Sequence, residues 1–576
     1  MAQLTLAERA RVARLAADRA RRSAVARVLG SPLLRWRYGA PVADELLIVP
    51  QDLRTADASF ADEIAVGHFG LAGRVAYLET GSPFDLRPPS EDWARELHGF
   101  SWLRHLRAAA NTRSTRAALS LVRDWIAHAR ARSGIAWEPA VVGRRLISWI
   151  VNAPILLEGV DQKTYDRTAD SLADQLVHLS ATWRDAPDGY PRLLAILGVA
   201  YGELCIAGHE RHLDKVESQL AGELNHQVLP DGGHASRNPG MLVELLLDVL
   251  PLRQCFVARG RRAPAELEET IARCLPMLRY MRLGDGTLAR FNGMGAPSID
   301  ALATALAYDS GRAHTITEAP QSRFVRMERD GVIVIVDTGS PPPIELAAQA
   351  HAGCLSFELS DGTAPVFVNG GAPGPADPEW RSVSRATASH NTLCLADTSS
   401  SRLVRHPLLE RLVGGVPIRL PDRVRASMGS GNEGDLLETA HNGYLGEFGL
   451  LHRRKLALAA DGSRFAGVDR LGPPRGTLRL VRDLPFAIHF HLHPSVECWT
   501  AGTGAASLSL RTGKRWRFLA EGAQMSIEPS VHYADLAGPA RSHQIVLRGT
   551  SSGETEVRWR LQRGDGSGEG TGPDSA

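Results

Sequence analysis

The stretch RFVRMERDGVIVIVDTG, residues 323–339, marks the point at which this chain changes from one kind of structure to another. From Phe324 onward the apolar residues recur with a period of two, which is typical of a β-strand. The Asp330-Gly331 pair in the middle is a strong signal for a tight turn between two strands. We therefore predict a β-hairpin here, and with it the beginning of a β domain.

The same pattern returns further along the chain. CLSFELSDGTAPVFVNGG (354–371) has Asp361-Gly362 at its centre, and LHRRKLALAADGSRFAGVDRL (451–471) has Asp461-Gly462. Short strands separated by Gly and Asp turns continue to about Leu561. Dense short strands of this kind predict an antiparallel β-sandwich.

Upstream of the switch, the apolar residues recur at intervals of three and four, as on one face of a helix. RLLAILGVAYGELCIAG (192–208) and GMLVELLLDVLPLR (240–253) are examples. Breakers such as Pro139 and the Pro-Asp-Gly-Gly stretch at 230–233 separate runs of ten to twenty residues. Helices of this length joined by short turns indicate paired helices in a ring or bundle.

A chain of 576 residues is too long for one hydrophobic core, so several domains are expected. We predict an N-terminal helix with an irregular arm over 1–90, a helical domain over 91–315, a β-sandwich over 320–562 and a disordered tail over 563–576. The Arg-rich helix at the N-terminus is expected to dock on the body of the protein; the alternative is a membrane surface.

Charge, apolar runs, cysteine spacing and motif content give no support to several classes of protein. The formal net charge of +2 gives no reason to expect a nucleic-acid partner. No run of eighteen apolar residues predicts a transmembrane helix, and no secretory signal is visible, which favours the cytoplasm. The six cysteines are scattered and indicate no disulfide framework. Phosphate-binding loops, GxSxG and HExxH motifs are missing.

Six segments, in their order along the chain, resemble the heparinase II/III-like family. They are WARELHGFSWLRHL (93–106), WEPAVVGRRLISW (137–149), GGHASRNPGMLVELLLDVL (232–250), HAGCLSFELSDG (351–362), RATASHNTL (385–393) and HNGYLGEFGLLHRRKL (441–456). The resemblance implies an (α/α) toroid of paired helices followed by a C-terminal antiparallel β-sandwich. It also implies β-elimination of uronic-acid polysaccharides, such as glycosaminoglycans or alginate, and a frequent location in the periplasm or cell envelope.

Elimination next to a uronate carboxylate sets three chemical tasks: neutralising the carboxylate, removing the α-proton and protonating the leaving oxygen. For the first task the resemblance points to Asn238, and His234 and Arg237 are expected to contact the substrate. Pro239 stands where the family often has a histidine. Asn238 before Pro239 is equally the start of a helix, so a capping role is the alternative.

Further candidates follow in the same half of the chain. Tyr280 lies where some members carry a catalytic tyrosine, although a buried helix aromatic is the commoner case. Arg290 and Asn292 lie in a Gly-rich loop, where the backbone can approach a ligand closely, and we expect them to contact substrate.

In the β half, His351 and His390 resemble family histidines associated with a zinc site, and they are also candidates for proton transfer. The position expected to supply the third ligand holds Asn369, a poor zinc ligand, and Gln349 replaces the first histidine of a His-x-His pair. The resemblance therefore implies a zinc ion in the β domain, whereas Asn369 and Gln349 argue against it. The tyrosine that many active members carry before 385–393 is missing here.

Tyr444 and His441 are the remaining proton-transfer candidates, with packing as the alternative for both. In HFHLHP, alternation places His489, His491 and His493 on one strand face, which we expect to be polar and exposed; a metal site is the alternative.

The leading hypothesis is a lyase-type protein that binds acidic polysaccharide between toroid and sandwich. The alternative is a carbohydrate-binding or cell-surface polymer assembly protein that kept this fold and lost elimination. A third hypothesis, a glycoside hydrolase, would need two facing carboxylates, for which Glu203 and Glu244 are the candidates.

Overall fold

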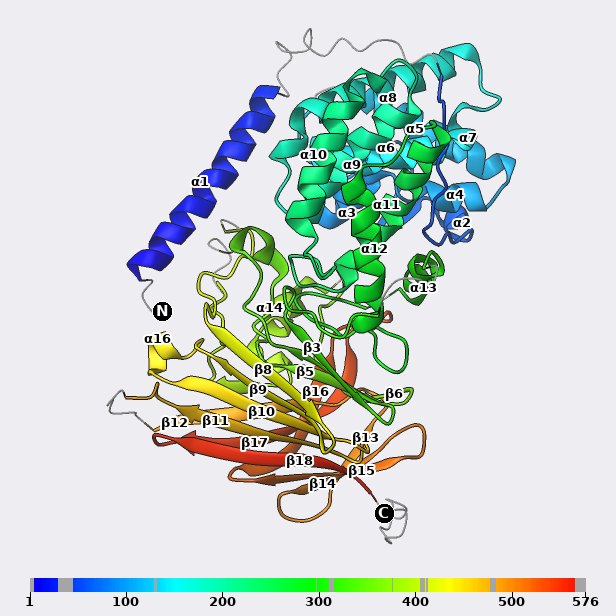
Figure 1. Ribbon diagram of the computed structural model, residues 1–576. Helices are drawn as coiled ribbons and strands as arrows, with labels where there is room; N and C mark the ends of the chain where they lie inside the picture. The colour runs from blue at the N-terminus through cyan, green and yellow to red at the C-terminus, as the bar shows by residue number, and fades with distance from the viewer. Residues whose placement is uncertain are drawn as a thin grey trace.

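The computed structural model describes residues 5–29, 45–128, 132–296, 298–309, 315–375, 377–404, 410, 413–476 and 483–564. A helical domain lies above a domain of sheets, and one long helix runs along their side (Figure 1). The switch predicted at Phe324 is confirmed, because β3 (Phe324–Arg329) is the first strand of the sheet domain. Of the tail expected over 563–576, residues 565–576 lie outside the described residues.

The N-terminal helix α1 (Leu6–Leu29) docks on the protein as expected. Thr5 and Glu8 exchange side-chain hydrogen bonds with each other's backbone N–H at its first turn, which forms a capping box. Glu8 also accepts from Arg402, and Arg11 donates to the carbonyl of Ile418, so the helix begins on the sheet domain. In the described residues, no helix is long and apolar enough to cross a membrane.

The arm after α1 is more regular than its sequence indicates. It contains α2 (Phe60–Ala65), the hairpin β1 (His68–Leu71) and β2 (Arg74–Tyr77), and the 3-10 turn η2 (Pro83–Asp85). Phe69 and Leu71 are buried in the core of the helical domain. Tertiary packing thus orders some segments of the arm that are too short to show a periodicity.

The helical domain consists of paired helices around one apolar core that includes Trp93, Trp102, Trp125 and Trp149. Its α-helices are α3 (Glu91–Gly99), α4 (Leu103–Ala108), α5 (Thr112–His128), α6 (Pro139–Val151), α7 (Ala153–Leu157), α8 (Gln162–Thr182), α9 (Tyr190–Cys205), α10 (Leu213–Gln227), α11 (Gly240–Ala258), α12 (Ala265–Tyr280) and α13 (Ile299–Ala307).

Helices α6 and α9 approach each other closely where both carry glycine. A Cβ added to Gly143 would lie 2.7 Å from the carbonyl oxygen of Leu194, and one added to Gly198 would lie 2.6 Å from the Cα of Gly143. Side chains at these positions would force the helices apart, because interiors are packed too densely to absorb the added atoms. The two glycines therefore allow the close approach of α6 and α9.

The sheet domain has three antiparallel sheets in the described residues. Their orders are β13-β14-β15-β18-β11-β10-β9-β8, β16-β17-β12-β7 and β3-β4-β5-β6. The strands are β3, β4 (Val332–Asp337), β5 (Phe357–Asp361), β6 (Ala364–Phe367), β7 (Leu393–Leu395), β8 (Val424–Gly431), β9 (Gly434–His441), β10 (Leu451–Ala459), β11 (Arg464–Gly472), β12 (Leu484–His491), β13 (Glu497–Thr500), β14 (Ala505–Ser509), β15 (Arg515–Glu521), β16 (Gln524–His532), β17 (Ala540–Ser551) and β18 (Thr555–Arg563). All three predicted Asp-Gly hairpins are confirmed.

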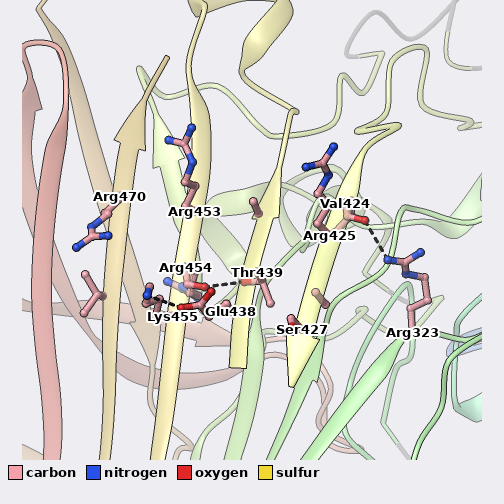
Figure 2. Close-up of a pocket in the computed structure, with 13 residues that line it drawn as sticks. Arg323, Val424, Arg425, Ser427, Glu438, Thr439, Arg453, Arg454, Lys455 and Arg470 are labelled. Carbon is pink, nitrogen blue, oxygen red and sulfur yellow. Dashed lines mark hydrogen bonds and ion pairs between the residues drawn. The ribbon is translucent and has the colours of Figure 1, made fainter. Parts of the chain in front are cut away.

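In the eight-stranded sheet, one face packs inward and the other faces out. Leu437 and Leu456 are paired across β9 and β10 and are fully buried. Their neighbours along the strands point the opposite way, as the alternation of a strand requires. Strand register places Arg425, Arg453 and Arg470 in one row across β8, β10 and β11, on the outward face of the sheet (Figure 2).

A buried polar chain crosses the same sheet on its inner side. The N–H of Gly443 donates to Nδ1 of His441, so Nε2 of His441 donates to Nδ1 of His452 at 3.2 Å. His452 in turn donates from Nε2 to Asp469, 2.7 Å away, and Arg454 also bonds that carboxylate. The charge of Arg454 holds the pKa of Asp469 far below its usual range, against its burial.

Candidate functional site

The loop between α10 and α11 carries three of the predicted site residues. His234 is buried, with Nδ1 bonded to the Ser236 hydroxyl at 2.7 Å and Nε2 to the Gln227 amide at 3.1 Å. Desolvation lowers its pKa to about 4, so it is neutral at pH 7. Oδ1 of Asn238 accepts from the N–H of Gly240 at 2.9 Å, which is the capping contact that the sequence predicted as an alternative.

Arg237 occupies a left-handed backbone conformation (φ +56°), and its guanidinium reaches across the domain boundary. It donates to the carboxylate of Asp337 at 2.6 Å and to the carbonyls of Ser322, Arg323 and Ser340. These contacts tie the helical domain to the start of the sheet domain. Because these bonds use all three nitrogens of the guanidinium, they leave it poorly placed to bind a substrate carboxylate.

Asn238 also lines a cavity of about 190 Å³ between α11 and the loop after α12. Glu244 and Gln349 line the same cavity. Its described lining includes neither Arg290 nor any of the histidines and tyrosines predicted for proton transfer. The structure therefore brings the predicted asparagine to a cavity without the predicted bases.

Arg290 and Asn292 lie in the loop after α12. The side-chain nitrogen of Asn292 donates to the carbonyl of Arg237 at 3.3 Å, which joins the two loops. The Arg290 guanidinium lies 3.7 Å from the carboxylate of Glu358, and both are buried. Nε and Nη1 of Arg290 and Oε2 of Glu358 have no hydrogen-bond partner among the described residues. Burial raises the pKa of Glu358 to about 7.

His351 and His390 lie together in the sheet domain, with Nδ1 of His351 and Nε2 of His390 3.0 Å apart. Nδ1 of His390 bonds the carbonyl of Ala386, so this nitrogen is protonated and Nε2 accepts from His351. Desolvation lowers the pKa of His390 to about 4, and it also holds the pKa of His351 well below its usual range. The pair is neutral at pH 7.

The two predicted tyrosines are bonded to the protein backbone. The Tyr280 hydroxyl donates to the carbonyl of Phe324 at 3.1 Å and accepts from the N–H of Arg326, so Tyr280 links α12 to β3. Burial raises its pKa to about 12. The Tyr444 hydroxyl donates to the carbonyl of Leu393 at 2.8 Å inside the sheet core. Both hydroxyls are therefore engaged by main-chain carbonyls inside the protein.

The expectation of an exposed histidine face in HFHLHP was wrong. His489 and His491 are 7% and 6% exposed, and the turn that carries Ala388 contacts the His491 ring. His491 bonds the Ser530 hydroxyl and the carbonyl of Ala388, and His489 bonds Gln544. These contacts satisfy the imidazoles within the protein.

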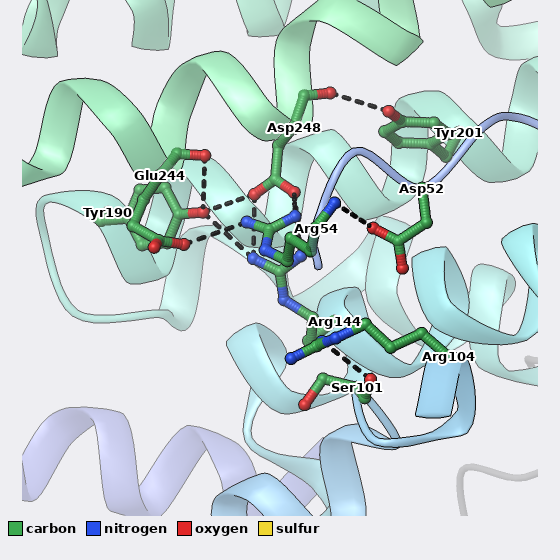
Figure 3. A network of polar contacts seen from close by, with 9 residues as sticks. All are labelled: Asp52, Arg54, Ser101, Arg104, Arg144, Tyr190, Tyr201, Glu244 and Asp248. Atoms are coloured by element: carbon green, nitrogen blue, oxygen red, sulfur yellow. Dashed lines mark hydrogen bonds and ion pairs between the residues drawn. The ribbon is translucent and has the colours of Figure 1, made fainter. Parts of the chain in front are cut away.

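Sequence reasoning missed a second group of polar residues inside the helical domain. Asp248 of α11 accepts from Arg54 at 2.7 Å and from both terminal nitrogens of Arg144 at 2.9 Å. The Tyr190 hydroxyl bonds the same carboxylate, and Arg54 also bonds Glu244 (Figure 3). The signal in the sequence was a pair of carboxylates four residues apart, Glu244 and Asp248, within the apolar helix pattern of 240–253.

This second group is charge-balanced, because Arg54 and Arg144 face the carboxylates of Asp248 and Glu244. Its two arginines hold the pKa of Asp248 far below its usual range, whereas burial raises the pKa of Tyr190. Glu203, the other carboxylate considered for hydrolysis, accepts from the N–H of His212, and burial raises its pKa to about 7. Glu203 and Glu244 share no partner among the described residues.

The comparisons with known proteins agree on one family. Residues 311–560 match the family described as "Heparinase II/III-like, C-terminal". The chain is 31% identical over 547 residues, 93% of each chain, to "FtsZ-localized protein C" of Caulobacter vibrioides (strain NA1000 / CB15N). The chain belongs to the heparinase II/III-like family.

Two solved structures share the fold of this heparinase II/III-like chain. A crystal structure of heparinase III superposes with a TM-score of 0.71 at 13% identity, covering 93% of this chain and 89% of that one. Heparan sulfate lyase HepC from Pedobacter heparinus gives a TM-score of 0.60 at 15% identity, with 93% and 88% covered. The predicted order of helical toroid and antiparallel sheets is thereby confirmed.

The zinc site of some heparinase II/III-like proteins does not fit the residues present here. Oδ1 of Asn369 accepts from the N–H of Asn391, and its side-chain nitrogen donates to the carbonyl of Arg290, so its donors are engaged by the backbone. Within the described ranges, no group of three or more His, Cys, Asp or Glu side chains could hold a metal ion. We derive no catalytic step through zinc.

Most of the predicted groups are hydrogen-bonded within the protein. Asn238 can still donate from its amide nitrogen into the cavity, since that atom bonds no described residue. The imidazoles of His351 and His390 bond each other, and the hydroxyls of Tyr280 and Tyr444 bond carbonyls. The catalytic and substrate-binding roles of all these residues, with those of His234, Arg237, Arg290 and Asn292, stay predictions.

Proposed function

We propose that this protein binds acidic polysaccharide on a lyase fold without cleaving it by β-elimination. One observation carries the proposal: both candidate catalytic tyrosines donate their hydroxyl protons to main-chain carbonyls within the protein. A general base must reach the proton that it removes, either directly or through one water molecule. Tyr280 and Tyr444 would have to break buried contacts to do so.

The ligand class is proposed from the family. Heparinase III and HepC are named for sulfated uronate polymers, and this chain shares their fold. The cavity beside Asn238 offers a neutral amide donor of the kind that a uronate carboxylate accepts. The polymer would lie at the boundary between the helical and sheet domains.

The test measures cleavage and binding separately. The protein is incubated with alginate, heparan sulfate and hyaluronan while the absorbance of unsaturated uronates is followed, and binding is measured by calorimetry. We expect binding to at least one polymer without a rise in absorbance. A steady rise would establish a lyase and overturn the proposal, and loss of that rise in Asn238→Ala would place the chemistry at the cavity.

A second proposal concerns the place of action. The relative with 31% identity over 93% of both chains is named for its localisation with FtsZ, and this likeness extends across both domains. We infer that this protein also gathers at the FtsZ ring. A fluorescent fusion should form a band that coincides with labelled FtsZ and disperses when FtsZ is depleted. A uniform or polar distribution would overturn this inference.

A further inference from the structure

The outward face of the eight-stranded sheet carries a trough that is separate from the cavity beside Asn238. The trough has a volume of about 560 Å³ and spans β8, β9, β10 and β11 (Figure 2). Arg425, Arg453, Lys455 and Arg470 line it on the sheet, and Arg323 reaches its edge. Glu438 is the only carboxylate among its described lining residues.

Strand register explains why these cations gather. Arg425 is opposite Ala440, Ala440 is opposite Arg453, and Arg453 is opposite Arg470, so the three arginines form a row across the sheet. Ala440 between two of them contributes only a methyl group. Because the Ala440 side chain is small, a hollow remains between the longer arginine side chains, which form its walls.

The charges in this trough are not balanced. Lys455 pairs with Glu438, and Arg470 pairs with Glu556 on β18. Arg453 donates to the carbonyl of Pro473 and Arg323 to that of Val424, whereas no ion pair with a described carboxylate involves Arg425. Three guanidinium charges at the trough therefore lack a described carboxylate.

The basic surface extends beyond the trough across the same face. The register from β11 through β18 to β15 places further arginines outward, and all of them are exposed: Arg464, Arg515, Arg517, Arg558 and Arg560. In the same register Trp499 on β13 faces outward, beyond Ser507 and Arg517, and is 38% exposed. From β8 to β13 the face spans seven strand spacings, or roughly 34 Å at about 4.8 Å each.

We propose that this sheet face, which we call the basic face, is a second binding surface for an extended acidic polysaccharide. The proposal rests on the proposed function and adds where the polymer lies. Arginine forks pair with carboxylate and sulfate groups, and forks on five of the six strands from β8 to β15 match a ligand with repeated charges. Trp499 at the far end offers a ring on which a pyranose can stack.

The composition of the basic face favours a glycan over other anions. A protein partner usually docks on a core depleted of charge and rich in aromatic side chains, and the outward positions of β8–β11, β18 and β15 carry no aromatic residue. Single-stranded nucleic acid needs a series of stacking rings, whereas this face has Trp499 alone.

Charge reversal tests the basic face. The variant Arg425→Glu/Arg453→Glu is compared with Arg113→Glu/Arg116→Glu, an equal charge change at exposed positions of α5. The probes are labelled heparan sulfate and alginate oligosaccharides, titrated at several salt concentrations. We expect the sheet variant to bind about tenfold or more weakly with a shallower salt dependence, and the α5 variant to change little. Trp499→Ala should also weaken binding.

Three results would overturn the proposal. The first is equal binding by the sheet variant and the α5 control. The second is full binding by the sheet variant together with loss of binding in Asn238→Ala, which would leave the proposed function standing with the polymer at the cavity alone. The third is tighter binding of duplex DNA or of an acidic peptide than of either polymer. Failure of the wild-type protein to bind any acidic polysaccharide would reject the proposed function itself, and the basic face with it.

Discussion

The guanidinium of Arg237 and the carboxylate of Asp337 meet at 2.6 Å, the first on the loop before α11 and the second at the end of β4. Both side chains are 6% exposed. The pair joins the helical domain to the sheet domain where a substrate cation was predicted. The charge thus serves the assembly of the two domains.

Removing one partner of this pair should be costly. Arg237→Ala leaves Asp337 buried without its cation, and breaking such a pair typically costs about 3–5 kcal/mol. Denaturant unfolding should show this loss, and Arg237→Ala/Asp337→Ala should lose less than the sum of the single variants. If Arg237→Ala keeps its stability and loses polysaccharide binding, Arg237 is a ligand contact after all.

The two tyrosines should behave as structural residues. Tyr444→Phe removes one hydrogen bond and should cost about 1 kcal/mol, whereas Tyr280→Phe also leaves the N–H of Arg326 without its acceptor and should cost about 1–3 kcal/mol. Polymer binding by both variants should match that of the wild-type protein. A phenylalanine variant with unchanged stability but altered binding or cleavage would place that hydroxyl at a ligand.

Glu358 should make the protein less stable as the pH rises. Its pKa is raised to about 7 in the folded protein, against 4.5 for the ordinary group, so the folded state holds a proton that the unfolded state releases. Stability should fall between pH 4.5 and 7, by about 3 kcal/mol at most. Glu358→Gln should flatten this slope, and the exposed Glu79→Gln should leave it unchanged. An unaltered slope in Glu358→Gln would show that other groups cause it.

The buried histidine pair should have the opposite effect. The pKa of His390 is lowered to about 4 in the folded protein. Below pH 6.5 this imidazole therefore binds a proton in the unfolded state but stays neutral in the folded state. Its contribution is complete above pH 6.5 and is lost as the pH falls toward 4, again about 3 kcal/mol at most. Unfolding measured from pH 7 to 4 should be less acid-sensitive in His390→Gln than in the exposed control His212→Gln. Equal sensitivity would contradict the neutral pair.

The fold was predictable because its signals are local. The turns at Asp330-Gly331, Asp361-Gly362 and Asp461-Gly462 need φ angles that those residues favour, and the helical segments repeat at three and four within one window. The hairpin of β1 and β2 was missed, since strands of four residues are too short to show a pattern.

The candidate site was predictable only in part. The capping contact of Asn238 spans two residues and was expected from the Asn-Pro pair. The link from Arg54 to Asp248 spans 194 residues, and no window of sequence contains both. The burial of His489 and His491 was misjudged for the same reason, because alternation gives the face of a strand and not what covers that face.

The amino-acid sequence by itself determined that paired helices precede antiparallel strands, and where the chain turns between the strands. Periodicity and turn chemistry act over a few residues, so they can be read in order along the chain. Only the tertiary structure decided that Arg237 bonds Asp337, that Tyr280 bonds Phe324 and that Arg425, Arg453 and Arg470 form one row. Each of these depends on which distant segments lie side by side, and this is fixed by packing and strand register across the whole molecule.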